Sequence, residues 1–425
     1  MQKFVITGGA PLHGDVRIAG AKNAVLKMMA AAILTDAPVT LRNVPRISDV
    51  AILREVMTGI GFDVRRSNGD ALDLHVQEAP WPFVSLEAGA KMRASFILLG
   101  PMLARFGRVI LPSPGGDRIG RRPVDFHVAA MERMGATIAY RNGYYFASAP
   151  SDGLRGAHIE FPAVTVMGTE NAMLAATLAR GTTLIDNAAL EPEVDDLIVM
   201  LLAMGARIAR TDERRIEVEG VDRLGGVDHR VLGDRLEAET FAIAAAITRG
   251  TVDLHGINPE HLGAFLGVCD RMGVSYETDA AAATLRVLGS GDRTLRPVDV
   301  RTDPYPGFAT DFQAPLSVLL TQADGVSTIH ETIFEDRLDY TRELVKMGAR
   351  IELLDERRAR ITGPTSLRGA EVGIADLRAG ATLILAALTA SGTSVISGIE
   401  HVDRGYEQIE AKLVALGAQI NRIEA

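Results

Sequence analysis

Two kinds of helical pattern alternate along the chain. Four stretches rich in alanine and leucine are apolar nearly all round, which predicts helices buried inside a core. They cover residues 24–35, 170–180, 239–248 and 381–390. Three other stretches carry apolar residues on one face only, which predicts amphipathic helices that lie on the outside against strands. They cover residues 122–134, 336–347 and 404–416.

Short segments in which apolar and polar residues partly alternate predict strands between these helices. Examples are residues 215–220, 328–334 and 358–363. A glycine that follows Met, Ile or Leu marks each passage from an outer helix into a strand, where a left-handed residue can end the helix. These glycines recur at intervals of 68 to 75 residues and are Gly61, Gly135, Gly205, Gly273, Gly348 and Gly417.

The recurrence indicates six copies of one unit of about seventy residues. A second marker supports it: an Ala/Leu-rich helix closed by glycine and followed by a β-branched strand, at Gly107, Gly181, Gly250, Gly325 and Gly392. Two helices and several strands in each unit predict an α/β fold. Six copies divided three and three would form two lobes, and the interface between lobes is a usual place for a ligand.

Composition narrows the functional class. The chain has 425 residues, 47% of them hydrophobic and 23% charged, as in an ordinary soluble protein. Its formal net charge of −9 argues against nucleic acid as a partner. No signal peptide or membrane span is evident, so a cytoplasmic protein is expected. The single cysteine, Cys269, excludes an internal disulfide and a Cys-based metal cage, and its apolar helical surroundings predict a buried structural thiol.

The segment 113–127, SPGGDRIGRRPVDFH, is predicted to be a loop because its glycines, prolines and charges fit neither a helix nor a strand. Adjacent glycines allow close approach of the backbone to a ligand, and arginines offer forked donors to carboxylate or phosphate oxygens. An anion site that holds one carboxylate, Asp117, among cations is one interpretation. A solvated surface turn is the other.

Polar residues also recur where the buried helices begin. Helix N-termini carry free N–H groups and partial positive charge, so converging ones would bind an anion. Taken singly, Asn23, Thr165, Asp234 and Asp311 could be plain helix caps. Lys22 and Arg93 fit that interpretation less well, because a cation opposes the helix dipole at this end.

Eight motifs occur in order along the chain and together carry a family resemblance. They are GAKNA, RAS, PGG-x-x-IG-x-RPVD, GTEN, DR-x-E, TDFQA, ETIFE-x-R and DRGYE. The sequence resembles the UDP-N-acetylglucosamine 1-carboxyvinyltransferase family, whose members begin peptidoglycan precursor synthesis. The resemblance implies a two-domain inside-out α/β barrel built from the six repeats. It implies that one lobe spans 21–230, and that 1–20 packs with 231–425 in the other.

The resemblance also implies the substrates and their residues. Phosphoenolpyruvate would be held by Lys22, Arg122 and Arg404, with Arg337 and Arg378 nearby. The UDP-sugar would be bound by Asn23, Arg93, Arg122, Pro123, Val124, Asp125, Phe126, Ala163, Val164, Thr165, Val166, Asp311 and Ile333. The sugar hydroxyl would attack C2 of phosphoenolpyruvate, and phosphate would leave from a tetrahedral intermediate. Neither a metal nor an organic cofactor is implied, and the partners are small molecules alone.

The sequence departs from the family pattern at three places. Asp117 stands where most members carry cysteine, so it is the candidate acid, and insensitivity to fosfomycin follows from the missing thiolate. Glu239 replaces a residue that is usually small, and Ser48 replaces a frequent lysine. A related transferase acting on another nucleotide or sugar phosphate therefore remains an alternative. A non-catalytic anion-binding homologue is another, although Asp311, the candidate base, favours an enzyme.

Overall fold

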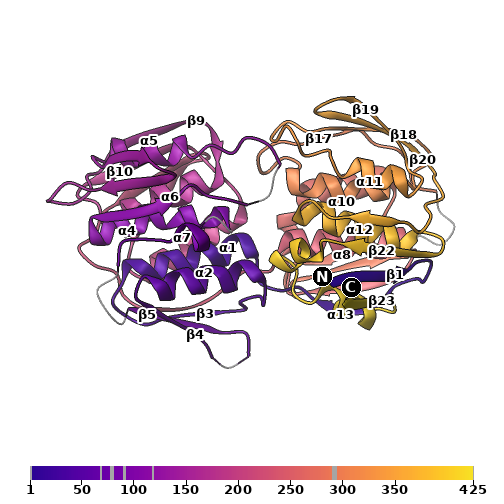
Figure 1. The fold of residues 1–425 in the computed structure, drawn as a ribbon, viewed down its shortest axis with the longest axis horizontal. Coiled ribbons are helices and arrows are strands. Elements are labelled where there is room, and N and C mark those ends of the chain that lie inside the picture. Colours follow the sequence, from indigo (N-terminus) through magenta and orange to yellow (C-terminus); the bar gives the residue numbers. More distant parts are fainter. Residues whose placement is uncertain are drawn as a thin grey trace. The chain divides into compact units, whose positions relative to one another are not determined.

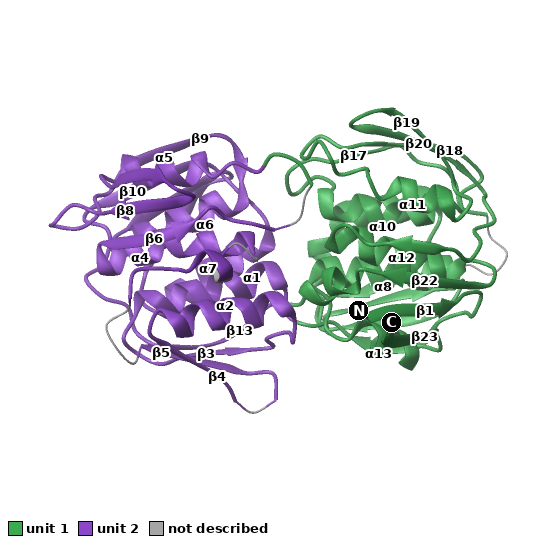
Figure 2. Ribbon diagram, viewed as in Figure 1, with its two compact units in different colours: residues 1–19, 117–121, 233–425 green, residues 20–116, 122–232 purple. Residues whose placement is uncertain are grey.

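The computed structural model describes residues 2–67, 69–76, 81–89, 92–116, 119–289 and 294–424. The chain groups into two compact units (Figure 2). Unit 1 comprises residues 1–19, 117–121 and 233–425, and unit 2 comprises residues 20–116 and 122–232. The sequence predicts the whole 113–127 loop in the lobe 21–230, whereas residues 117–121 group with unit 1.

The described residues of unit 1 form three sheets, each of four strands. The first has the order β21 (Glu371–Gly373), β22 (Thr393–Ser397), β1 (Gln2–Thr7) and β23 (Gln419–Glu424). The second has the order β15 (Ser275–Asp279), β16 (Thr284–Leu288), β14 (Thr251–His255) and β2 (His13–Arg17). The third has the order β17 (Val300–Arg301), β18 (Gly325–His330), β20 (Arg358–Gly363) and β19 (Arg350–Asp355).

The described residues of unit 2 also form three sheets. One has the order β13 (Val227–Arg230), β3 (Val39–Arg42), β5 (Leu72–Val76) and β4 (Phe62–Arg66). Another has the order β11 (Arg207–Asp212), β12 (Arg215–Glu219), β10 (Thr182–Ala188) and β9 (His158–Thr165). The smallest has the order β6 (Arg108–Pro112), β8 (Tyr144–Ser148) and β7 (Thr137–Arg141).

The same pairing pattern recurs in these sheets. A parallel pair is followed by antiparallel neighbours, as in β9 with β10 and then β12. Even the three-stranded sheet has a parallel partner, a bridge from Phe83 to Ile110. In the first sheet of unit 1 the strand β1 lies between β22 and β23, so that Phe4 is opposite both Ile396 and Arg422. The N-terminal segment therefore completes the last repeat, which accounts for its place in unit 1.

The buried helices predicted from the sequence are present. In unit 1 they are α8 (Arg235–Ile247), α10 (Thr310–Leu320) and α12 (Leu377–Thr389), which pack against one another. Figure 1 shows them between the sheet of β18 and β20 and the sheet of β1 and β22. In unit 2 they are α1 (Lys22–Ala31) with η1 (Ala32–Leu34), η2 (Arg93–Leu98) with α4 (Leu99–Phe106), and α6 (Val166–Ala176). Burial of their apolar side chains supplies the main driving force for folding.

The amphipathic helices and the remaining short helices complete the fold. They are α2 (Ser48–Gly59), α3 (Leu86–Gly89), α5 (Asp125–Arg133), α7 (Pro192–Ala203), η3 (Pro259–Leu262), α9 (Gly263–Met272), α11 (Thr341–Lys346), η4 (Ile399–Arg404) and α13 (Ile409–Ala415).

The six glycines that mark the repeats all have φ between +86° and +104°. The predicted left-handed helix ends are confirmed. No helix in the described part of the chain is long and apolar enough to cross a membrane.

Three expectations about element boundaries are wrong. The strand expected over 328–334 ends at His330, because the following residues form a turn held by the Glu331 carboxylate. The helix expected over 336–347 is regular only in α11, and the one expected over 404–416 only in α13. The residues that precede α11 and α13 contact other elements instead, as Arg337 does with Asp311 and Tyr406 with Thr240. These tertiary contacts outweigh the local helical pattern.

Candidate active site

Three of the predicted site residues meet in unit 1. Asp311 is the second residue of α10, Arg378 the second of α12, and Arg337 lies shortly before α11. The Arg337 Nη2 donates to Asp311 Oδ1 across 2.5 Å, and Arg378 Nε lies 3.6 Å from the same oxygen. The arginine side chains are buried, while that of Asp311 is 27% exposed. The fold thus gathers a carboxylate and two cations from segments far apart in the sequence.

The charges of this cluster set its chemistry. Burial by itself would raise the pKa of Asp311, but Arg378 and Arg337 outweigh it and hold this pKa well below its ordinary value. Arg235, at the start of α8, acts in the same direction. Three guanidinium groups therefore favour the ionised form of one carboxyl group. Their forked donors suit a small anion with carboxylate or phosphate oxygens.

The helix-cap interpretation holds for some of the polar residues and fails for others. The Thr165 hydroxyl accepts from Gly168 N–H at 3.3 Å, and the Asp234 carboxylate accepts from Leu236 N–H at 2.8 Å. Both are ordinary caps. Asn23 and Asp311 are not: α1 and α10 are preceded by Ala21 and Ala309, neither of which provides a side-chain cap. Asp311 instead points its carboxylate at arginines.

A buried glutamate, Glu331, organises the surroundings of Asp311 and Ile333. Its Oε1 accepts from Ile333 N–H at 2.7 Å and from Phe334 N–H at 3.1 Å. Its Oε2 accepts from the hydroxyl of Thr310, the first residue of α10, at 2.8 Å. One side chain therefore fixes both the turn that carries Ile333 and the start of the helix that carries Asp311. This role of Glu331 is not evident from the sequence, although the residue belongs to one of the motifs.

Tyr406 connects the C-terminal motif to the same cluster. Its hydroxyl accepts from Arg378 Nη1 at 3.0 Å and contacts the Thr240 hydroxyl at 2.8 Å, in a fully buried position. Arg404 ends η4 two residues earlier. Because Tyr406 anchors this segment to α8 and α12, the position of Arg404 is set by the same network. The signal in the sequence was the aromatic residue inside the DRGYE motif.

In unit 2, the predicted phosphate-binding Lys22 opens α1. Its Nζ lies 2.7 Å from Asp49 Oδ2, and the Asp49 side chain is almost fully buried. A cation at the positive end of a helix is unfavourable alone, and this carboxylate from α2 offsets it. Asp49 was not predicted. It follows Ser48, the position noted as a departure from the family.

Arg93 contacts both described parts of the 113–127 loop. Its Nη2 donates to the Pro123 carbonyl at 2.9 Å. Gly116, with φ of +110°, packs so closely on the backbone and Cβ of Arg93 that a Cβ there would lie 3.1 Å away. Burial and the neighbouring charge of Arg122 lower the pKa of Arg93 to about 10. Two adjacent guanidinium groups that repel each other would be stabilised by a bound anion.

The other residues predicted to bind the UDP-sugar lie at two places in unit 2. Val124, Asp125 and Phe126 are at the start of α5, where the Phe126 ring lies 6.2 Å from that of Phe161. Ala163, Val164, Thr165 and Val166 span the passage from β9 into α6. Asp117 lies outside the described residues, so the structure gives no account of it. Beyond it, the Ile119 carbonyl accepts from Asp336 N–H at 3.4 Å within unit 1.

Glu239 shares the environment of the unit 1 cluster. It is 1% exposed, and within the described residues neither of its oxygens makes a hydrogen bond of ordinary geometry. Burial is the largest effect and raises the pKa of this carboxyl well above its ordinary value. Arg378 lowers this pKa and Asp311 raises it, both by less than burial does. The presence of Glu239 changes the shape and polarity of the surroundings of Asp311 and Arg378.

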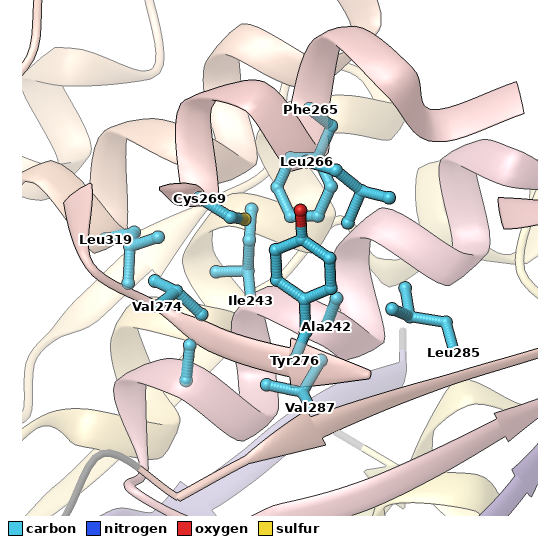
Figure 3. A pocket seen from close by; sticks show the side chains of 11 residues that line it. Ala242, Ile243, Phe265, Leu266, Cys269, Val274, Tyr276, Leu285, Val287 and Leu319 are labelled. Carbon is cyan, nitrogen blue, oxygen red and sulfur yellow. The ribbon is translucent and has the colours of Figure 1, made fainter. Parts of the chain in front are cut away.

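An apolar cavity in unit 1 contains the single cysteine. Figure 3 shows Cys269 beside Ile243, Val274 and Leu319, with Tyr276 and Phe265 also lining the space. The cavity measures about 10 Å³, enough for no more than one water. Cys269 is buried, as predicted, and burial raises the pKa of its thiol. Among the described residues, no group of His, Cys, Asp or Glu side chains is arranged to hold a metal ion.

Comparison with known proteins gives consistent matches over the whole chain. Residues 6–413 match the family described as EPSP synthase (3-phosphoshikimate 1-carboxyvinyltransferase). The UDP-N-acetylglucosamine 1-carboxyvinyltransferase of Solibacter usitatus is 46% identical over 424 residues, covering 100% of both chains. The protein of the same name from Cereibacter sphaeroides (strain ATCC 17025 / ATH 2.4.3) is 47% identical, with the same coverage.

Solved structures show the same fold. The enolpyruvyl transferase NikO from Streptomyces tendae matches with a TM-score of 0.88 and 24% identity, covering 100% of this chain and 99% of that one. EPSP synthase from Acinetobacter baumannii matches with a TM-score of 0.81 and 19% identity, covering 100% of both. The fold is that of these enolpyruvyl transferases. The chain belongs to the EPSP synthase family and, within it, groups with the relatives named UDP-N-acetylglucosamine 1-carboxyvinyltransferase.

Proposed function

We propose that this transferase moves the enolpyruvyl group of phosphoenolpyruvate to the 3′-hydroxyl of UDP-N-acetylglucosamine and releases phosphate. This is the first committed step of peptidoglycan precursor synthesis, and we assign it to the cytoplasm. The observation that carries the proposal is the carboxylate of Asp311 held between Arg337 and Arg378. The names of relatives at about 46% identity support the choice of substrates.

The cations are assigned to phosphoenolpyruvate. Lys22, Arg122 and Arg404 would bind its phosphate and carboxylate groups. Arg337 and Arg378 would assist, because forked guanidinium groups grip two oxygens at once. Lys22 would then share its charge between Asp49 and the substrate phosphate. Phosphate leaves with a growing negative charge, which fixed cations stabilise without reorganisation.

Asp311 is assigned the role of base for the sugar hydroxyl. A carboxylate whose pKa is held far below its ordinary value is a weak base. If the anionic substrate accepts the hydrogen bonds of Arg337 and Arg378, these arginines lower the pKa of Asp311 less. Its basicity then rises. Substrate binding would thus prepare the base, and hydroxyl deprotonation would follow the arrival of phosphoenolpyruvate.

Asp117 is assigned the role of acid toward C3 of phosphoenolpyruvate. A carboxyl group can donate this proton only if some acid form persists near neutral pH. The arginines that neighbour Asp117 in the sequence oppose this, because nearby cations favour the ionised form. Desolvation by closure of the 113–127 loop would have to raise the pKa of Asp117 during the reaction.

Glu239 supports a second candidate, a related transferase with another acceptor. This carboxyl group is buried beside Asp311 and Arg378, at a position where the family usually has a small residue. An altered environment of the base could suit a different nucleotide or sugar phosphate. A binding protein without catalysis is disfavoured, since it would need the arginines but not a carboxylate among them.

Phosphate release from phosphoenolpyruvate tests the proposal and ranks the acceptors. UDP-N-acetylglucosamine, UMP and shikimate 3-phosphate are compared at equal concentration, with phosphoenolpyruvate alone as the blank. We expect release with UDP-N-acetylglucosamine at a rate far above the other three reactions. Preference for another acceptor would establish the second candidate, and release with none of them would refute both.

A further inference from the structure

Three consecutive polar residues of α6 are fully buried, namely Thr169, Glu170 and Asn171 of the GTEN motif. Thr169 donates to the Thr165 carbonyl at 2.7 Å and so braces the start of its own helix. The Asn171 amide donates to the Phe96 carbonyl at 3.0 Å and accepts from Gly100 N–H at 2.7 Å. The motif therefore holds α6 against η2 and α4. The proposed mechanism uses none of these three side chains.

Glu170 connects α6 to α1. Its Oε2 lies 3.4 Å from Lys27 Nζ, and both side chains are buried. The same Lys27 ammonium donates to the carbonyl of Asn23 at 2.5 Å, one turn earlier in α1. A buried cation near the positive end of a helix needs a compensating anion, which Glu170 supplies. Within the described residues Glu170 makes no hydrogen bond besides this ionic contact.

We propose that Glu170 is a positioning residue for substrate binding. Through Lys27 it fixes the first turn of α1, which carries Asn23, relative to the start of α6, which carries Thr165. This inference rests on the proposed function, because both helix starts are assigned to the UDP-sugar. Glu170 itself touches no substrate and takes no part in the chemistry.

The charges around Glu170 make the positioning sensitive to pH. Lys27 faces it from α1, while Glu193 and Glu191 face it from the start of α7. Burial and the two carboxylates together outweigh Lys27 and raise the pKa of Glu170 to about 7. The ion pair is therefore complete above this pH and is lost below it. Affinity for the UDP-sugar is expected to fall as the pH drops from 8 to 6.

The free energy of unfolding should change with pH in the direction opposite to the affinity for the UDP-sugar. A carboxyl group whose pKa is raised in the folded state stabilises the fold at low pH, and this contribution is lost as the pH rises through 7. Replacing Glu170 by glutamine alone leaves the buried Lys27 ammonium without its anion and should lower stability, whereas Lys27→Met together with Glu170→Gln removes both buried charges and should not. A positioning role thus predicts that this double variant is no less stable but binds more weakly. A merely structural role predicts loss of stability and no change of affinity in the folded protein.

The experiment measures UDP-N-acetylglucosamine binding by calorimetry at pH 8 and pH 6, together with the melting temperature. Glu170→Gln should raise Kd about tenfold at pH 8, within the usual range of coupling between sites, and clearly less at pH 6. The effects of Lys27→Met and Glu170→Gln should not add, since either change breaks the same pair. The matched control is the pair Lys412 and Glu237 in unit 1, 2.6 Å apart. Lys412→Met with Glu237→Gln should leave Kd unchanged.

Two readouts separate this inference from the proposed function. If the wild type binds the UDP-sugar and Glu170→Gln binds it equally at both pH values, the positioning role is refuted. If the wild type does not bind it, the proposed function fails, and amide hydrogen exchange of residues 22–27 decides the inference. Exchange there should be faster in Glu170→Gln at pH 8, after correction for the intrinsic rate. Unchanged exchange would overturn the inference by itself.

Discussion

Arg337 donates a hydrogen bond to Asp311 across 2.5 Å, so the proposed base is bound to one of the cations proposed for the anionic substrate. This contact makes the order of events testable. A carboxylate tied to Arg337 and Arg378 gains basicity when the substrate competes for them. The arrangement favours deprotonation of the acceptor after phosphoenolpyruvate has bound.

The first prediction concerns Asp311 itself. Asp311→Asn keeps the shape of the side chain but removes its basicity, and loss of one general base typically costs about 10²–10⁴-fold in rate. Turnover should fall by that order while UDP-N-acetylglucosamine still binds. Steady-state kinetics and calorimetry check the two parts. Asp186→Asn, which removes an ion pair with Arg215 in unit 2, is the control and should keep normal turnover. Near-normal turnover of Asp311→Asn would eliminate the assignment.

The second prediction concerns the arginines assigned to phosphoenolpyruvate. Arg122→Lys and Arg404→Lys keep the charge but lose the fork that grips two oxygens. The KM for phosphoenolpyruvate should rise at least about tenfold, as expected for loss of roughly one charged hydrogen bond. Arg342→Lys, an exposed arginine of α11, provides the control. Saturation curves that match the wild type would show that neither arginine makes the proposed contact.

The third prediction concerns pH and stability. His127 is 3% exposed and its Nδ1 accepts from the Asn171 amide at 3.0 Å. Burial and then Arg93 lower the pKa of His127 to about 3, whereas an unfolded histidine titrates near 6.5. The unfolded state therefore binds the extra proton first, and stability is lost as the pH falls from 6.5 toward 3. The slope is up to about 1.4 kcal/mol per pH unit.

His127→Gln should lack this part of the pH dependence. Urea unfolding at pH 7 and pH 5 gives the free energy of unfolding of both proteins. The wild type should lose about 2 kcal/mol more than the variant over this interval. Groups common to both proteins, Glu170 included, cancel in the difference. His75→Gln, at an exposed position of β5, should behave like the wild type. Equal losses in His127→Gln and wild type would show that His127 is protonated in the folded protein.

The fourth prediction concerns the residue at the family's cysteine position. Fosfomycin inactivates the cysteine-bearing members through a loop thiolate, which attacks a strained epoxide carbon far better than a carboxylate does. Asp117 offers no thiolate, and Cys269 is buried with a raised pKa. We expect the wild type to be resistant and Asp117→Cys to be sensitive. Asp117→Ala should lose most activity, because alanine cannot donate a proton. Time-dependent inactivation of the wild type, with mass added at Asp117 or Cys269, would contradict this account.

Much of the fold could be predicted from the sequence because its signals are local. The repeating glycines end helices in a left-handed conformation, and their φ values confirm this. Helices that are apolar all round have to be buried, as α8 is along its whole length. The pairing of strands is not local. Nothing in residues 2–7 indicates that β1 lies between β22 and β23, almost four hundred residues away in the sequence.

In the candidate site, too, some residues could be predicted from the sequence and their contacts could not. Asp311, Arg337 and Arg378 were named from motifs, and the structure brings them together. Their partners were not predicted, because an ion pair such as Lys22 with Asp49 depends on how two helices pack. The same holds for Lys27 with Glu170, since a charged residue inside an apolar helix gives no indication of its counterion. Tertiary geometry decides these contacts, and no sequence spacing encodes them.

The most direct test of the central claim is the identity of the product. Phosphoenolpyruvate labelled with ¹³C at C2 is incubated with UDP-N-acetylglucosamine and the enzyme, and the product is examined by NMR and mass spectrometry. The account predicts an enol ether in which the labelled carbon is joined to the 3′-oxygen of the sugar, formed with one phosphate per product. Unlabelled UDP-N-acetylglucosamine recovered beside free labelled pyruvate, or an adduct at another oxygen, would contradict it.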